Sequence, residues 1–397
     1  MKRRRNVKRK KKNKIDIKAI ILPLLLIGLI IYIIYFLMLF FGIETVDSVA
    51  ENIASYTILS QEKGDVEKTM FLFEKEVEDL RRISDIYVLL QNKNRGISLL
   101  IYVPGSIYFE GLEEEFGNPI SISSLRYAGD FLQEDRGVEY ALWQLSEILG
   151  FKVQNYIWIT TEAYEKILEI YGEPSLLKEK DKLAYHPSVN KELTDSFFQL
   201  STFSSNVSAT DTFLKIRQIK ELDGQIFSNL SFFNVMQRLS SFKKEVENTE
   251  AYALDISRSN FSTEKFSENG GVVSSMNIKE YDKVLRNYVF KMIDKELEKE
   301  RVRVEVYNGT DVAGRALIYS RKIQNSGCDV VRFGNAPVGH ERTQIYISDK
   351  NQFKNSLKVI SDVLLGRFEM LEERPSFMTT GDIVIILGDD IAHTEIF

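Results

Sequence analysis

The sequence predicts a membrane-anchored α/β protein with two folded parts, and three observations lead to this prediction. Residues 19–43 form a run of twenty-five residues without a charged side chain, directly after a basic tail. Strand-like blocks and amphipathic helical stretches alternate between about residues 67 and 250. Four short apolar blocks, each bounded by Gly, Asn or Asp, follow residue 300. Strands that alternate with helices favour a sheet with helices packed on it.

The basic tail differs in charge from the rest of the chain. The 397 residues carry a net charge of −5, but residues 1–18 contain eleven Lys and Arg and one acid. The tail therefore sums to +10 and the remainder to −15. Basic tails also occur as nucleic-acid arms. Beside an apolar run, however, such charge holds the N-terminus in the cytoplasm and touches anionic lipid. We therefore expect membrane lipid, and no nucleic acid, as the partner of this tail.

The apolar run 19–43 has the length of a transmembrane helix. At about 1.5 Å per residue it would extend roughly 37 Å, enough to cross a bilayer with some tilt. With the basic tail inside, residues 44–397 are predicted to lie outside the cell membrane, behind a single span. A signal peptide cleaved after Ser48-Val49-Ala50 is the alternative. The apolar run is far longer than an ordinary signal core, which favours an uncleaved anchor.

Cysteine and histidine usage excludes several kinds of site. Cys328 is the one cysteine, so no intrachain disulfide is possible, and we expect it to be a small, partly buried side chain. Three widely separated histidines and one cysteine argue against a zinc site of the usual spacing. No G-x-S-x-G nucleophile elbow is present, which argues against a serine-based triad.

The expected elements of the first folded part follow a stalk at 44–66. The domain at 67–250 is predicted to contain, in order, a hairpin of strands 86–90 and 97–103, a helix at 138–149, a strand at 153–159, a helix after the capping residue Thr160 or Thr161, and helices at 211–222 and 232–246. A linker and helix are expected at 251–300. Its Ser-, Asn- and Gly-rich stretch 250–277 is predicted to be a loop, and 281–299 to be helical.

The last part, 301–397, is predicted to be a small domain of its own. Its expected elements, in order, are a strand at 302–306, a helix at 312–326, strands at 328–333 and 343–347, a helix at 352–364 and a strand at 383–387. This order describes a compact β-α-β-β-α-β unit of the right size for one small core.

Several motifs in this last domain recur together in one family. They are Asn308-Gly309-Thr310 with Ala313-Gly314, Gly334-Asn335-Ala336, Glu341-Arg342-Thr343 and Leu387-Gly388-Asp389-Asp390. In this order they resemble the LytR C-terminal domain, over about residues 301–391. The resemblance implies an extracytoplasmic domain of a bacterial envelope protein, behind a LytR-CpsA-Psr catalytic domain.

The middle of the chain resembles a LytR-CpsA-Psr domain more weakly. The matching stretches are Arg82–Ile86, Leu149–Gly172 and the late helix Asp211–Gln218. The resemblance implies an α-β-α layered domain. Active members of this family transfer a glycopolymer phosphate from a polyprenyl lipid carrier to peptidoglycan. Such chemistry requires arginine forks on phosphate oxygens and carboxylates that hold Mg²⁺.

This chain departs from the family pattern at three positions. Gly105 and Ser106 stand where the family has Arg and Asp, and Leu214 stands where the late helix has its first Arg. Lost phosphate clamps cost orders of magnitude in rate. The sequence therefore predicts a degenerate, non-catalytic or weakly active relative that binds cell-wall polymer, lipid-linked precursor or an envelope partner. The alternative is an active phosphotransferase that uses Mg²⁺. A structural anchor or transcriptional attenuator is a third class, although no helix-turn-helix is evident.

The residues that remain form two candidate sites. The candidates for binding phosphate or lipid are Arg81, Arg82, Arg126, Arg217 and Gln218, and the candidate metal ligands are Asp85 and Glu74. The alternative for each is ordinary surface charge or helix capping. In the last domain, Asn308, Gly309 and Thr310 are candidates for binding an anion at a helix start. The alternative there is a strand-to-helix turn in which Thr310 or Asp311 caps the helix.

Overall fold

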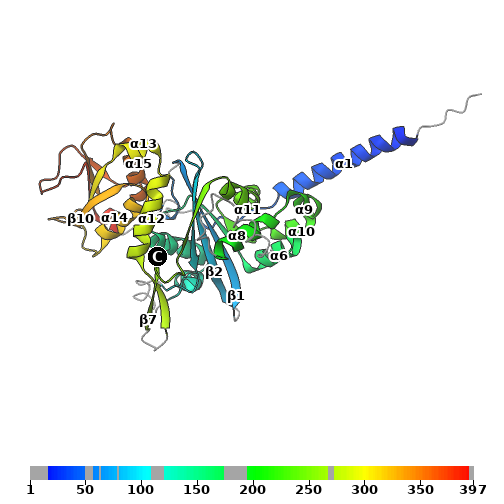
Figure 1. Cartoon of the computed structure of the whole chain (residues 1–397), viewed down its shortest axis with the longest axis horizontal. Coiled ribbons are helices and arrows are strands. Elements are labelled where there is room, and N and C mark those ends of the chain that lie inside the picture. Colours follow the sequence, from blue (N-terminus) through cyan, green and yellow to red (C-terminus); the bar gives the residue numbers. More distant parts are fainter. Residues whose placement is uncertain are drawn as a thin grey trace, which may run out of the picture.

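The computed structural model describes residues 17–49, 57–61, 64–77, 80–108, 120–173, 195–266 and 272–392. The basic tail up to Asp16 and the alternative cleavage residue Ala50 lie outside these ranges, as do parts of the predicted stalk. Figure 1 shows three parts in a row: the long helix α1, an α/β domain, and a smaller domain at the opposite end from α1.

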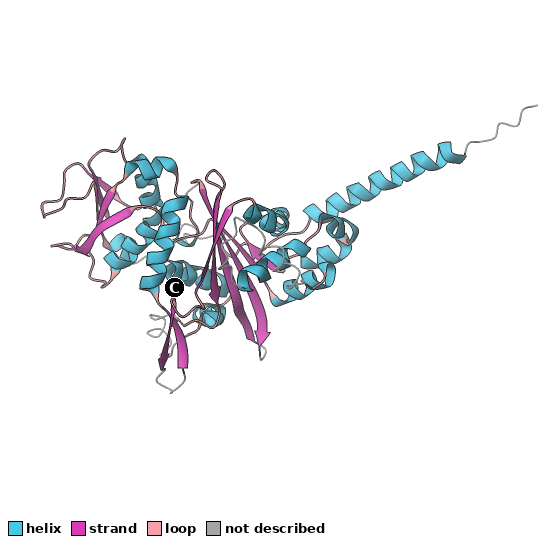
Figure 2. Cartoon of the chain, viewed as in Figure 1, coloured by secondary structure: helices cyan, strands magenta, loops and turns pink. Residues whose placement is uncertain are grey.

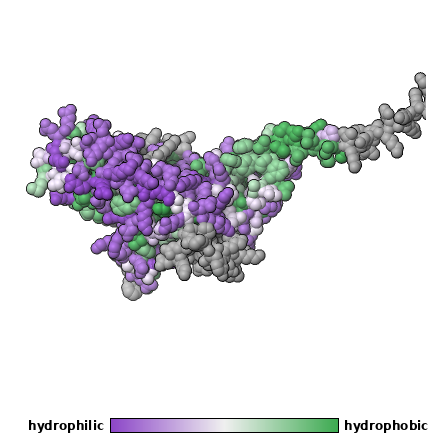
Figure 3. Space-filling view, turned by 45° about the horizontal axis from the view of Figure 1, so that its top comes forward, coloured by the Kyte–Doolittle hydropathy of each residue, from purple (hydrophilic) through white to green (hydrophobic). Residues whose placement is uncertain are grey.

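Helix α1, Ile17–Phe41, contains the predicted span. Pro23 lies near its start, where the missing hydrogen bond costs little. The segment Ile21–Phe41 has a mean hydropathy of 2.9, and its first eleven residues are exposed on every side. Figure 3 shows this apolar surface projecting from the more polar domains. Such a helix is compatible with a single-pass membrane anchor.

The larger domain is built on a six-stranded sheet. Its strands, in the spatial order β5-β4-β1-β2-β3-β6, are Ile226–Ser228, Asn155–Ile159, Val66–Val77, Leu80–Asn92, Ile97–Pro104 and Glu250–Asp255. Strands β1, β2 and β3 form an antiparallel meander, while β4 runs parallel to β1 and β6 parallel to β3. The predicted hairpin is the pair β2-β3, which lies inside the sheet between β1 and β6.

Helices cover both faces of this sheet, which confirms the α-β-α layering (Figure 2). One face packs on α4, Leu125–Leu132, and α5, Gly137–Leu149. The other face packs on the helices α6, α8 and α11, with bounds Thr161–Tyr171, Asp195–Asn206 and Phe232–Glu247. Side chains of β4 alternate between the two layers, because successive residues of a strand point to opposite faces.

Local signals predicted most of these helices, and nonlocal pairing explains what they missed. Thr160 caps α6, with its hydroxyl accepting a hydrogen bond from the Ala163 amide at 3.2 Å. The expected helix 211–222 is divided into α9, α10 and a 3₁₀ turn (Ala209–Leu214, Ile216–Ile219, Lys220–Leu222). The expected loop at 250–277 is wrong. It forms the edge strand β6 and the hairpin β7-β8 (Ser262–Phe266, Val272–Met276), which the pairing of β6 with β3 stabilises.

The smaller domain contains the predicted elements in the predicted order. Its sheet has the order β10-β9-β13-β11-β12, with bounds Asp329–Asn335, Arg303–Asn308, Ile383–Leu387, Gln344–Ile347 and Glu369–Leu371. The helices are α14, Arg315–Asn325, and α15, Lys354–Val363, followed by the short α16, Asp389–Ala392. Strand β12 was not predicted; it has three residues and carries no pattern of its own.

The two domains share one hydrophobic core. Helices α12, Ile278–Met292, and α13, Lys295–Glu300, lie between them and contribute Tyr281 and Leu285 to this core. Lys152 of the larger domain is buried and pairs with Asp362 of α15 at 3.4 Å. Burial lowers the pKa of Lys152 to about 8. The domains therefore meet through packed apolar residues and buried polar contacts.

Candidate functional site

A β-bulge separates the two candidate metal ligands. Strands β1 and β2 pair regularly until Phe73 meets Asp85, and the register then shifts so that Glu74 meets Ile83. Residues directly opposite each other in an antiparallel pair share a face. Asp85 therefore lies on the face of Phe73, toward α6 and α8, and Glu74 on the face of Ile83, toward α4 and α5.

Glu74 is completely buried and pairs with Arg126 of α4. The Arg126 guanidinium also lies over the rings of Phe227, at 5.3 Å, and Trp158, at 5.9 Å. Burial raises the pKa of Glu74, and the charge and hydrogen bond of Arg126 offset only part of this rise. Oε2 of Glu74 has no hydrogen-bond partner among the described residues. Arg126 thus neutralises the buried carboxylate of Glu74. Its guanidinium points into the domain and is already paired with that charge.

Asp85 belongs to an aromatic layer on the other face. Its Oδ1 accepts a hydrogen bond from the Tyr102 hydroxyl at 2.9 Å. Around it the rings of Phe73 and Tyr87 meet edge to face at 5.8 Å, and Tyr164 stacks on Phe203 at 5.3 Å. Asp85 is partly buried and lies among aromatic rings. Its hydrogen bond with Tyr102 joins β2 to β3.

Glu74 and Asp85 do not form a shared Mg²⁺ site in this arrangement. A bound Mg²⁺ requires its carboxylate ligands at about 2.0–2.1 Å from one point, whereas the sheet lies between these two side chains. Within the described ranges, no group of three or more His, Cys, Asp and Glu side chains is arranged to hold a metal ion. The residues present therefore do not fit the metal that the family resemblance implies.

The loop after β3 packs closely on β2 at Gly105. The Gly105 amide donates to the Ser84 carbonyl at 2.9 Å, so the loop packs directly on the bulge. A Cβ at Gly105 would lie 2.0 Å from the Ile83 carbonyl oxygen. Side-chain bulk at this position requires the backbone to move, while Ser106 beside it is exposed.

We expect Gly105→Ala to destabilise the larger domain by about 1–3 kcal/mol, because overpacking against backbone cannot be relieved by a rotamer change. Chemical denaturation followed by tryptophan fluorescence measures this loss. Gly334→Ala is the matched control, since a Cβ there meets no atom within 4 Å. Equal midpoints for the two variants would contradict the close approach at Gly105.

The other arginine candidates have separate surroundings. Arg81 on β2 is half exposed and forms an ion pair with Glu162 of α6 at 2.8 Å. Arg82 lies beside it, opposite Lys75 of β1. Arg217 of α10 is exposed at the base of α1, and its hydrogen bond with the Tyr35 hydroxyl raises its pKa. Gln218 is half-buried on the same short helix. The structure therefore places Arg81 and Arg82 at one end of β2 with their side chains on opposite faces of the strand, and it places Arg217 beside Tyr35 of α1.

The Asn-Gly-Thr motif of the smaller domain is a self-satisfied turn. The Asn308 carboxamide oxygen accepts from the Thr310 amide at 3.1 Å and from the Thr310 hydroxyl at 2.8 Å, and the Val312 amide donates to that hydroxyl. The Gly309 amide donates to the Leu387 carbonyl at 2.9 Å. Neither Thr310 nor Asp311 caps the next helix, because α14 begins after Gly314, which has a left-handed φ of 82°. The capping expectation is therefore wrong, and the amide donors of the turn are used internally.

The remaining motifs of this domain meet the same turn. The His340 amide donates to the Gly309 carbonyl at 2.7 Å. Asp390 accepts from both the amide and the hydroxyl of Thr343 at 2.8 Å, and that hydroxyl accepts from the Gly388 amide. Blocks separated by up to eighty residues thus form one hydrogen-bonded cluster at the end of β9 and β13. The motifs that characterise the domain hold its fold together.

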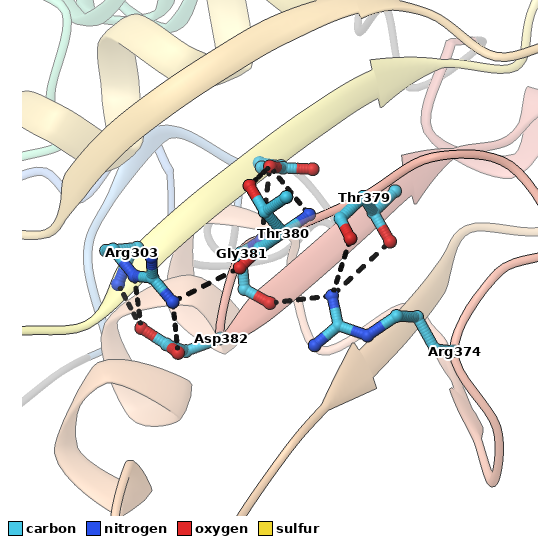
Figure 4. A network of polar contacts seen from close by, with 7 residues as sticks. Arg303, Arg374, Thr379, Thr380, Gly381 and Asp382 are labelled. Atoms are coloured by element: carbon cyan, nitrogen blue, oxygen red, sulfur yellow. Dashed lines mark hydrogen bonds and ion pairs between the residues drawn. The ribbon is translucent and has the colours of Figure 1, made fainter.

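A second polar cluster was missed in the sequence. Figure 4 shows Arg303 paired with Asp382, while Arg374 donates to the Gly381 carbonyl at 3.0 Å. Glu305 is buried and accepts from the amide and hydroxyl of Thr380 at 3.1 and 2.9 Å. Burial alone would raise the pKa of Glu305. The hydrogen bonds from Thr380 outweigh this effect, so the pKa of Glu305 lies below its usual value. The sequence signal for this cluster was weak: Glu305 is a charged residue between two valines of the apolar strand β9.

A comparison with known protein families gives a match in the smaller domain. Residues 301–390 match the family described as LytR cell envelope-related transcriptional attenuator. No curated protein matches the chain. Among solved structures, TagV from B. subtilis is 10% identical with a TM-score of 0.39, covering 58% of this chain and 98% of that chain. TagT from B. subtilis is 13% identical with a TM-score of 0.36, covering 63% and 97%. The Lin1025 protein from Listeria innocua is 10% identical with a TM-score of 0.37, covering 57% and 99%.

The family match and the cluster of motif residues describe the same ninety residues. The match ends at Asp390, the residue whose carboxylate closes the cluster on Thr343. This chain therefore carries, at residues 301–390, a LytR C-terminal domain.

Proposed function

We propose that this chain is a single-pass bacterial cell-envelope protein that binds a cell-wall glycopolymer or its polyprenyl-linked precursor without transferring it. The LytR C-terminal domain supports an envelope role. The apolar helix α1 supports anchorage beside lipid-linked precursors. The resemblance of the larger domain to the LytR-CpsA-Psr pattern supports a ligand that carries phosphate.

One observation carries the non-catalytic part of the proposal: Glu74 and Asp85 lie on opposite faces of the sheet. Phosphoryl transfer depends on cations that converge on one phosphate. Here Arg126 is committed to Glu74, and Arg217 is exposed beside Tyr35 at the base of α1. Arg81 and Arg82 follow one another at one end of β2 and point to opposite faces of the strand, so we propose that each guanidinium forms its own contact with a phosphate of the ligand, with Arg81 leaving its half-exposed ion pair with Glu162.

Mass spectrometry of the purified full chain tests this binding. We expect a copurified polyprenyl phosphate or pyrophosphate lipid, and we expect the double variant Arg81→Ala/Arg82→Ala to retain severalfold less of it. Lys283→Ala is the control, because Lys283 is exposed on α12. Absence of such a lipid from the wild type, together with no uptake when it is added, would reject the proposed ligand.

A further inference from the structure

Helix α1 continues beyond its lipid-exposed part as a packed element of the domain. The residues that turn inward on α1 and just after it are Tyr32, Phe36, Leu39, Phe40 and Ile43. Their spacing of three or four residues places them on one helical face. Phe40 and Ile43 belong to the core of the larger domain, whereas residues 21–31 contact no part of it closely enough to be covered.

Specific contacts fix this packing. The Tyr32 hydroxyl donates to the Phe213 carbonyl of α9 at 2.9 Å, and their rings meet edge to face at 5.0 Å. Phe40 contacts Phe232 of α11 at 5.7 Å. Lys220 donates to the carbonyl of Gly42 at 2.8 Å. The end of α1 therefore packs as one body with α9, the 3₁₀ turn Lys220–Leu222 and α11.

Large apolar side chains remain exposed around this junction. Leu214 is 66% exposed, Phe41 65% and Phe233 47%. We refer to these three residues as the collar. Phe41 and Phe233 contact each other at 6.0 Å between ring centroids. In Figure 3 the apolar surface of α1 continues to where the helix meets the domain. Exposed apolar residues grouped beside a membrane span mark a surface that meets lipid.

The length of α1 places the collar at the membrane surface. With Lys18 at the inner edge, about 30 Å of hydrocarbon is crossed after roughly twenty residues, near Met38. Phe41 then lies about 5 Å further, within the headgroup layer. Phe213, whose ring contacts Tyr32 and Phe36, and its chain neighbour Leu214 then lie a few ångströms below that edge. Interfacial apolar segments are buried to a depth of about 5–10 Å.

We propose that the collar inserts shallowly into the outer leaflet and holds the larger domain directly against the lipid surface. Arg217 beside Tyr35 is compatible with this placement, because the apolar stem of an arginine lies along apolar surface while its guanidinium extends toward the phosphate level. The alternative, in which α1 is shifted outward and the domain is raised into water, would leave all three collar side chains hydrated. The inference rests on the proposed membrane anchorage.

Fluorescence quenching of the full chain in phosphatidylcholine–phosphatidylglycerol vesicles tests the proposal. Single cysteines at Leu214, Ile27 and Val338 carry an environment-sensitive dye; the native Cys328 is buried and reacts little. Val338, which is 64% exposed in the smaller domain, is the matched control. We expect nitroxide lipids labelled near the headgroup to quench the dye of L214C at least threefold more than that of V338C.

The possible outcomes separate the two levels of inference. Equal quenching of L214C and V338C by aqueous iodide, with I27C protected, would overturn the collar while leaving the anchor intact. Exposure of I27C to iodide would overturn the anchorage and the collar together. Protection of L214C from iodide without quenching by nitroxide lipid would mean that a protein, such as a second copy of this chain, covers the collar, and this too would overturn the proposal.

Discussion

Arg321→Ala is expected to lower the free energy of unfolding by about 3–5 kcal/mol, because it leaves a buried carboxylate unpaired. Arg321 of α14 donates to Asp282 of α12 at 2.6 Å, and both side chains are nearly buried. The same guanidinium donates to the carbonyls of Glu147 and Ile148 at the C-terminal end of α5. A cation at the C-terminal end of a helix also interacts favourably with the negative end of the helix dipole. One side chain thus joins both domains and the helix between them.

Calorimetry and denaturant unfolding of the Arg321→Ala variant measure this loss. Lys283→Ala is the control on α12, one residue from Asp282 and 72% exposed at its side chain, and it should change stability by less than about 0.5 kcal/mol. A loss below about 1 kcal/mol for Arg321→Ala would show that the domains do not depend on this contact.

Arg126→Ala is expected to destabilise the protein by about 3–5 kcal/mol at neutral pH, since Glu74 is then buried without its cation. Removing the cation raises the pKa of Glu74 still further above its unfolded value. The added cost is then present above the folded-state pKa and disappears as the pH falls toward the unfolded value near 4.5. The unfolding curves of the variant and the wild type should therefore differ at neutral pH and converge as the pH is lowered.

Two further variants make this result specific to charge. Arg126→Ala/Glu74→Gln should recover part of the lost stability at neutral pH, because no buried charge remains. Arg81→Ala removes a half-exposed ion pair and should cost less than about 1 kcal/mol. A loss for Arg126→Ala that stays constant with pH would assign its role to packing on Trp158 and Phe227 instead.

Sequence predicted the fold where local signals fix the structure. Thr160 as a cap, Gly150 as a left-handed helix end and the four blocks of the smaller domain are signals of this kind. Strand β6 was missed because its partner β3 lies about 150 residues away in the chain. Pairing across such a separation leaves no mark on the composition of a Ser- and Asn-rich segment.

The candidate sites were less predictable, because they depend on register and on three-dimensional neighbours. The bulge at Ser84 turns Asp85 away from Glu74, and no spacing rule reveals a shift of one residue. Glu74 was singled out as a metal ligand, but its partner in the structure is Arg126, from a helix 52 residues later. Arg217 lies against α1, a contact that motif matching does not consider.

Turnover of a polyprenyl pyrophosphate-linked glycopolymer by the purified full chain with Mg²⁺ tests the central claim most directly. We expect the lipid to bind and no transfer or hydrolysis above background. Turnover at roughly 1 s⁻¹ or faster, typical of enzymes, and lost in folded Arg217→Ala and Asp85→Ala variants, would contradict the account and identify the chain as a phosphotransferase with a rearranged site.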